Sequence, residues 1–205
     1  MRRIFVIVFI CLLFANCKKN NSEFDNSEIK EINEIVKIVI LEDSLNVLKS
    51  ESESKMFSVN LIKLNIYIPE KRKENEPIPP LSPSFNNVSI ENLLYYKIEN
   101  KMFFTTNDSL FLLKQNLKPN KLKIENEIIE KINVTSKKIE LKKKKIGKSY
   151  NYYEMTIPIF SKDNQKAYLE LNHYCGYLCG SGKSIYLKKI NGKWKIVDKW
   201  RTWIS

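Results

Sequence analysis

The last third of the chain alternates apolar and polar residues with a period of two, and this pattern constrains the fold more than any other feature. Successive side chains of a β-strand point to opposite faces of a sheet, so the pattern predicts strands. We expect four of them, over residues 150–160, 166–175, 184–190 and 193–204. Asn191 and Gly192 separate the last two, which is typical of a tight hairpin. The sequence therefore predicts an antiparallel C-terminal β-meander.

Large apolar side chains fall on both faces of the last predicted strand. By alternation, Trp194, Ile196 and Trp200 share one face. Val197 and Trp203 take the other face. Because a sheet face that carries aromatic side chains needs cover, we expect other elements to pack on part of each face.

Helical periodicity precedes the meander. Apolar residues recur at spacings of three and four over 28–48, which predicts a helix with one buried stripe, and Ser27 is expected to cap it. Shorter helices are expected over 89–96 and 108–115, whereas 121–149 is ambiguous. The prediction is a single α+β domain over 28–205, with N-terminal and central helices packed on the meander.

Two shorter segments complete the predicted domain. Residues 56–68 alternate as a half-buried strand does, and a short strand is expected over 102–105. A proline-rich loop follows over 69–83. It is interpreted as a stiff surface connection, and the alternative is a polyproline ligand for a partner.

The chain is strongly basic. It has 205 residues, 43% of them hydrophobic and 28% charged, with a formal net charge of +12. These values are ordinary for a folded domain apart from the charge. Four consecutive lysines over 142–145 are expected to be exposed. A solvated surface is the simpler interpretation, and a polyanion-binding basic surface is an alternative function.

The N-terminus has the features of an export signal. Arg2 and Arg3 precede an apolar run of 11 residues over 4–14, which matches a secretory signal and is too short to span a bilayer. Ala15, Asn16 and Cys17 follow, and the segment resembles the lipobox of bacterial lipoproteins. The usual pattern has leucine at the position of Phe14 and a smaller residue at that of Asn16.

The lipobox resemblance implies a location and a partner. Residues 1–16 are expected to be a signal peptide, and 17–27 a flexible tether that begins with the lipidated Cys17. Acyl chains on Cys17 would place the protein in the cell envelope, with membrane lipid as its partner. In a Gram-negative cell, the lysines after Cys17 favour the outer membrane and its periplasmic face.

Two cysteines lie between predicted strands, in the segment HYCGYLCGSGKS. An exported protein meets an oxidising compartment, so a Cys175–Cys179 disulfide is the leading interpretation. Free thiols are an alternative, as is a zinc site that includes His173, although no fourth ligand is evident. Gly182, Lys183 and Ser184 match the end of a phosphate-binding loop motif. That loop is followed by a helix, whereas a strand is expected here, so no nucleotide is expected as a ligand. The nearby glycines are attributed to backbone freedom in a hairpin loop.

The same segment holds the candidates for catalysis. His173 could serve as a base for Cys175, Cys179 or Ser181, but no third residue is placed to orient it. We therefore predict no catalytic residue and no cofactor, and a non-enzymatic binding or interaction module with an unknown protein or envelope partner. The alternative is an enzyme with a pocket on the C-terminal sheet that uses His173. Nucleic acid is not expected as a partner.

The C-terminal segment carries a further resemblance. The stretch AYLELNHYCGYLCGSGKSIYLKKINGKWKIVDKWRTWIS is similar to uncharacterised lipoproteins of flavobacteria and other Bacteroidetes. That resemblance implies export and a small α+β domain, and it assigns no activity. The terminal hairpin is also similar to the cone-shaped folds of the nuclear transport factor 2 superfamily, in which helices close over a curved sheet.

Overall fold

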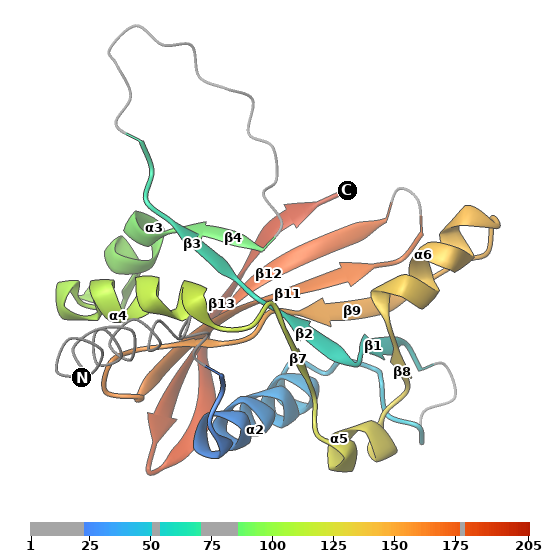
Figure 1. Cartoon of the computed structure of the whole chain (residues 1–205), viewed down its shortest axis with the longest axis horizontal. Coiled ribbons are helices and arrows are strands. Elements are labelled where there is room, and N and C mark those ends of the chain that lie inside the picture. Colours follow the sequence, from blue (N-terminus) through green and yellow to red (C-terminus); the bar gives the residue numbers. More distant parts are fainter. Residues whose placement is uncertain (1–22, 51–53, 71–85, 177–178) are drawn as a thin grey trace, which may run out of the picture.

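The computed structural model describes residues 23–50, 54–70, 86–176 and 179–205. The predicted signal peptide, Cys17 and nearly all of the proline-rich loop lie outside these residues. Within them the protein is a mixed α+β structure (Figure 1). None of the helices in this part of the chain combines the length and the apolar character that a membrane crossing needs.

A seven-stranded sheet is the centre of the fold. Its strand order is β13-β12-β11-β9-β1-β8, and β10 pairs with β11 beside β9. The strands are β1 (Met56–Ser58), β8 (Val134–Thr135), β9 (Tyr152–Met155), β10 (Ile159–Phe160), β11 (Lys166–Tyr174), β12 (Gly180–Ile190) and β13 (Lys193–Ile204). The strands β11, β12 and β13 form the predicted antiparallel meander, and β9 is antiparallel to β11. The strand β1 runs parallel to both of its neighbours.

The boundaries of the meander differ in two places from the prediction. Asn191 and Gly192 form the expected hairpin, each with a positive φ. The predicted strand over 150–160 is interrupted at residues 156–158, so β9 and β10 are separate. The strand β12 begins at Gly180, four residues earlier than expected.

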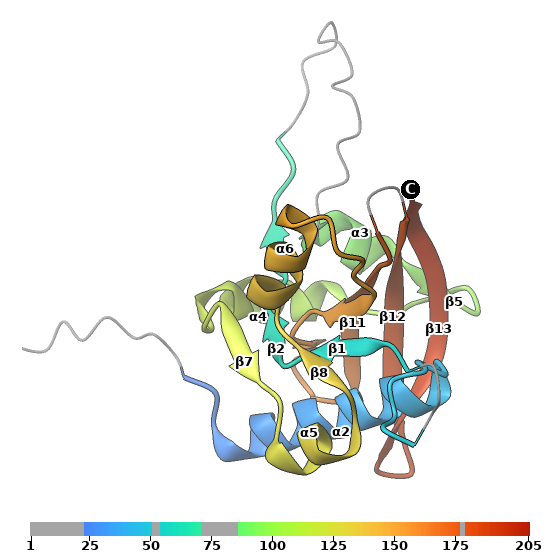
Figure 2. The ribbon, with the colours of Figure 1, turned by 90° about the vertical axis from the view of Figure 1, so that its right-hand side faces the viewer.

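One face of the sheet is covered by α2 (Asn26–Glu42), which Figure 2 shows lying across the strands. Its predicted stripe is buried in a core with side chains of β11, β12 and β13. Asp25, not Ser27, is the N-cap: its carboxylate accepts from the Glu28 N–H at 2.8 Å, and Glu28 accepts in return from the Asp25 N–H. This reciprocal pair starts the helix inside the predicted tether.

The opposite face is covered by smaller elements. The strands β3 (Asn65–Tyr67) and β4 (Asn87–Ser89) form a parallel pair in front of the sheet, beside α3 (Ile90–Tyr95) and α4 (Ser109–Lys114) (Figure 1). Their apolar side chains form a second core with Tyr168 of β11 and Tyr186 of β12. The sheet is therefore the middle of three layers, and both faces carry cover as predicted.

The remaining elements are short. They are β2 (Asn60–Ile62), β5 (Lys97–Ile98), β6 (Lys101–Met102), β7 (Lys121–Lys123), α5 (Asn126–Lys131) and α6 (Lys137–Lys145), with single helical turns at Thr106–Asp108 and Gln115–Leu117. The predicted helix over 89–96 is confirmed as α3, with Ser89 as its N-cap. The predicted strand over 56–68 is divided into β1, β2 and β3, each of which pairs in a different sheet. The cone-like arrangement stays a prediction.

Candidate binding groove

An open groove of about 580 Å³ lies on the α3 side of the sheet. This volume is typical of sites for small molecules. We call it the aromatic groove, and it is lined by Tyr67, Asn87, Val88, Ser89, Asn92, Tyr95, Tyr96, Tyr168, Glu170, Ser184, Tyr186, Trp200, Thr202 and Trp203. The strands β11, β12 and β13 supply its floor, and β3, β4 and α3 supply its wall.

Hydrogen bonds and ring contacts hold the floor in place. The Tyr168 hydroxyl lies 2.8 Å from the Ser184 hydroxyl and donates to Glu170 at 3.3 Å. Tyr186 stacks on Tyr96, the C-cap residue of α3, with ring centroids 4.1 Å apart, and meets Tyr168 edge to face. Because these contacts join β11 and β12 to the end of α3, they fix the distance between floor and wall.

Three aromatic side chains on the groove remain open to solvent. Tyr67 is 44% exposed, Tyr95 68% and Trp200 45%. They come from β3, α3 and β13, so no single element carries them. Large exposed aromatic rings around a concavity are typical of a binding surface.

Two bulges in β13 place both tryptophans on the groove. Residues 186 and 187 of β12 are adjacent, but they pair with Asp198 and Ile196 of β13, so Val197 is an extra, unpaired residue. Thr202 is the extra residue of a second bulge near the end of β13. A bulge shifts the alternation of the residues that follow. The prediction that Trp200 shares a face with Trp194 is therefore wrong: Trp194 lies in the core under α2, whereas Trp200 lines the groove.

Two glycines of β12 make room for Trp203. A methyl group on Gly182 would overlap the indole ring, and one on Gly180 would lie 2.9 Å from it. The sequence attributed these glycines to backbone freedom in a loop, but neither of the two has a positive φ. That explanation holds for Gly176, whose φ is 112°. Trp203 Nε1–H also donates to the side-chain Oδ1 of Asn172 at 2.9 Å, which holds the indole over β12.

An asparagine beyond α4 positions the outer wall. The Asn116 side chain accepts from the Ile66 N–H at 2.9 Å and donates to the Ile66 carbonyl at 2.7 Å. It therefore satisfies the free edge of β3 as a neighbouring strand would. Because Tyr67 follows Ile66, this clamp sets the position of an exposed ring of the groove.

Glu170 is the ionisable group of the groove floor. Burial raises its pKa to about 7, and hydrogen bonds from Tyr168 and from the Asn86 backbone oppose the shift. Near neutral pH the carboxyl group is thus divided between its protonated and ionised forms, and it can both donate and accept hydrogen bonds. None of the groove-lining residues, all of which lie in the described part of the chain, is a lysine or an arginine.

His173 does not line the aromatic groove, and the alternative of an enzyme that uses His173 stays a prediction. Its ring stacks on Tyr153, with centroids 4.5 Å apart, and its Nε2 lies 2.8 Å from Asn151 Oδ1. Strand alternation explains the difference, because Glu170 and His173 are three residues apart and face opposite sides of β11. Burial lowers the pKa of His173 to about 4, with help from Lys55 and Lys183.

The two cysteines form the predicted disulfide. Cys175 and Cys179 are bonded with a Cα–Cα distance of 5.0 Å, and the Cys175 N–H donates to the Cys179 carbonyl at 2.9 Å. The bridge closes the connection from β11 to β12. The free-thiol and zinc alternatives are set aside, and no three His, Cys, Asp or Glu side chains meet as metal ligands within the described ranges. Residues 182–184 lie in β12, and the strand continues after Ser184 as predicted, whereas Gly182 was expected in the loop before it.

The lysine run occupies the last turn of α6, a helix that the sequence did not resolve. Lys142, Lys144 and Lys145 are exposed as predicted, whereas Lys143 is partly covered and pairs with the buried Glu140 at 2.8 Å. Among the described residues, none that lines the aromatic groove belongs to α6. The lysines and the groove are therefore separate features.

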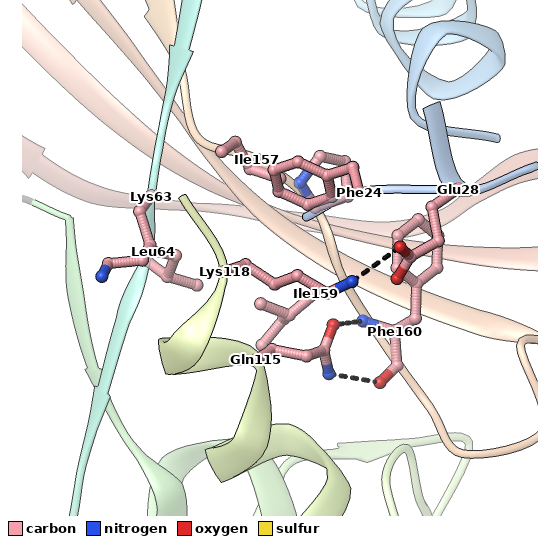
Figure 3. Close-up of a pocket in the computed structure, with 10 residues that line it drawn as sticks. Phe24, Glu28, Lys63, Leu64, Gln115, Lys118, Ile157, Ile159 and Phe160 are labelled. Carbon is pink, nitrogen blue, oxygen red and sulfur yellow. Dashed lines mark hydrogen bonds and ion pairs between the residues drawn. The ribbon is translucent and has the colours of Figure 1, made fainter. Parts of the chain in front are cut away.

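A second cavity is too small to be a site. It measures about 20 Å³, room for about one water molecule. Figure 3 shows it between Phe24 and Ile159, where Lys118 pairs with Glu28 at 2.7 Å and Gln115 bonds both backbone groups of Phe160. These contacts dock the start of α2 against β10, so they are structural.

Comparison of the chain with protein-family models, with curated protein sequences and with solved structures found no match. The functional argument therefore rests on the groove itself. Sequence reasoning missed it because its residues come from six elements and their placement depends on two bulges. The signal that could have pointed to it was the excess of tyrosine and tryptophan on the outer face of the predicted meander.

Proposed function

We propose that the protein is a membrane-anchored lipoprotein of the cell envelope, whose domain is a non-enzymatic module that binds a ligand in the aromatic groove. The lipobox-like sequence that ends at Cys17 supports the anchor, and the lysines after it favour the periplasmic face of an outer membrane. One observation carries the binding role: exposed aromatic rings from three elements surround a polar floor in a preformed concavity.

The composition of the groove favours binding over catalysis. Its lining contains Glu170 but no histidine, cysteine, lysine or arginine within the described residues. The hydroxyl of Ser184 is engaged with Tyr168, not with a base that could activate it. Polyanion binding by the exposed lysines of α6 is the second candidate, favoured by their position together in one helical turn.

Photo-crosslinking in the producing cell tests the binding role. A benzophenone amino acid replaces Tyr95, which is exposed on the groove, and in a matched variant replaces Phe111, which is exposed on α4 outside it. We expect a discrete adduct on illumination of the Tyr95 variant and none from the Phe111 variant. An equal pattern from the two variants, or no adduct at position 95, contradicts the proposal.

A further inference from the structure

We propose that the aromatic groove binds a neutral glycan, a chain of uncharged sugar rings. This inference deepens the proposed function and rests on it. It follows from the combination of exposed aromatic faces, uncharged hydrogen-bonding groups and the absence of cationic side chains among the described residues of the lining.

The exposed rings match the apolar faces of sugars. A sugar ring presents C–H groups on its faces, and these carry a small positive charge that is attracted to the negative face of an aromatic ring. Tyr67, Tyr95 and Trp200 offer such faces from three sides of one groove. Trp200 lies on β13 where that strand pairs with β12, so the backbone that carries the ring is held in place before a ligand arrives. A ring on an ordered strand loses less entropy on binding than a ring on a mobile segment.

The polar groups match the hydroxyls of the same ligand. Each hydroxyl that a sugar buries needs a partner, since an unpaired buried polar group is costly. The groove supplies side chains that donate and accept, namely Asn87, Asn92, Thr202 and Glu170. All except Glu170 are neutral, and Glu170 can accept from a hydroxyl in its ionised form and donate in its protonated form.

The charge of the groove argues against an anionic ligand. The chain has 35 lysines and arginines, yet none lines the groove within the described residues. A sulfated or phosphorylated ligand would need cationic partners once desolvated. A permanent cation is a weaker match than a neutral ligand, because the environment of Glu170 disfavours the ionised carboxylate that would neutralise it.

Titration of the full-length lipoprotein with oligosaccharides tests the inference. The protein is held in a polyoxyethylene detergent, which carries no sugar. It is titrated with three tetrasaccharides: β-1,4-linked N-acetylglucosamine, β-1,4-linked glucose and α-1,4-linked glucose. Tryptophan fluorescence reports binding because Trp200 and Trp203 line the groove, and calorimetry confirms it. We expect saturable binding of at least one oligosaccharide with a Kd below about 1 mM.

Variants locate the binding. We expect Trp200→Ala to weaken it at least tenfold, and Phe111→Ala, which removes an exposed ring outside the groove, to leave it unchanged. No saturable binding of any of the three oligosaccharides, or binding that Trp200→Ala leaves intact, overturns the glycan assignment. Preferential binding of tetramethylammonium or of heparin overturns it as well.

The two proposals fail separately. A groove-specific adduct at position 95, together with no oligosaccharide binding, removes the glycan inference and leaves the binding module. Treatment of that adduct with periodate, which cleaves vicinal diols, adds a direct check, with the unmodified protein treated in parallel as the reference for oxidation of its own side chains: a glycan with vicinal diols is cleaved, and a ligand without them is not.

Discussion

Glu170 illustrates how burial changes what one side chain can do. The residue lies on β11, an interior strand of the sheet, where alternation directs it to the groove. Its carboxyl group gains hydrogen bonds from Tyr168 and from the Asn86 backbone, but desolvation outweighs them, and the pKa rises to about 7. The group therefore titrates in the pH range where the protein would work, which a solvent-exposed glutamate does not.

The raised pKa of Glu170 predicts a pH-dependent stability difference. Between the ordinary pKa of 4.5 and about 7, the folded state binds a proton that the unfolded state has released, so stability falls as the pH rises through this window. We expect Glu170→Gln to gain about 3 kcal/mol in free energy of unfolding relative to the wild type between pH 4 and pH 8. Urea denaturation at several pH values measures this difference. Glu34→Gln, which changes an exposed glutamate of α2, should show a flat difference, and a flat difference for Glu170→Gln would refute the assigned pKa.

At the scale of elements, carboxylates of α2 attach the helix to the meander. Glu31 pairs with Lys189 of β12 at 2.7 Å. Asp43, the C-cap, accepts from Lys183 at 2.7 Å and from Lys199 at 2.6 Å, and its side chain is fully buried. An acidic residue at a helix C-terminus is unfavourable by itself. The two lysines, which come from neighbouring strands, offset that effect and fix where the helix ends against the sheet.

We expect Asp43→Asn to lower the free energy of unfolding by about 2 kcal/mol, because the two lysines lose their shared partner but can turn toward solvent. Chemical denaturation at neutral pH measures the loss. Glu127→Gln is the matched control: Glu127 of α5 also pairs with two lysines, but it is exposed, so little change is expected. Equal losses for the two variants would show that burial of Asp43 is not the reason for its contribution.

At the scale of the whole molecule, the predicted anchor and the groove belong to different parts of the chain. The first described residues lie where Phe24 and Glu28 dock against Lys118, beside β10. The groove opens on the sheet face opposite α2. The described chain therefore starts beside β10, and α2, which follows, lies on the face opposite the groove and does not cover it.

The predicted lipidation of Cys17 can be tested by fractionation. Acyl chains add about 0.8 kcal/mol per buried methylene, so their loss should release the protein from membranes. We expect Cys17→Ala to move the protein from the membrane fraction to the soluble fraction, as detected by immunoblot. Cys11→Ala, a substitution within the apolar run, should leave it with the membranes. Sedimentation of the Cys17 variant with membranes would show that another feature anchors the protein.

Local patterns were sufficient for the meander and for the helices α2 and α3. Period-two alternation located β11 and β13, and the Asn-Gly pair located the turn between β12 and β13. The stripe of apolar residues with a period of 3.6 located α2. Boundaries were less accurate because they depend on specific contacts: Asp25 displaced Ser27 as the N-cap through its reciprocal bonds with Glu28. The predicted strand over 56–68 failed as a unit because its three parts pair with strands from distant parts of the chain.

The sequence alone determined the α+β class, the meander and the leading interpretation of the cysteine pair, because each depends on residues that are close together in the chain. Only the tertiary structure decided the groove. The bulge at Val197 that turns Trp200 to the groove face arises from pairing with β12, and Glu170 lies in a groove that α3 and β4 complete. Such properties depend on the free energy of contacts between distant segments, which no local pattern of residues records.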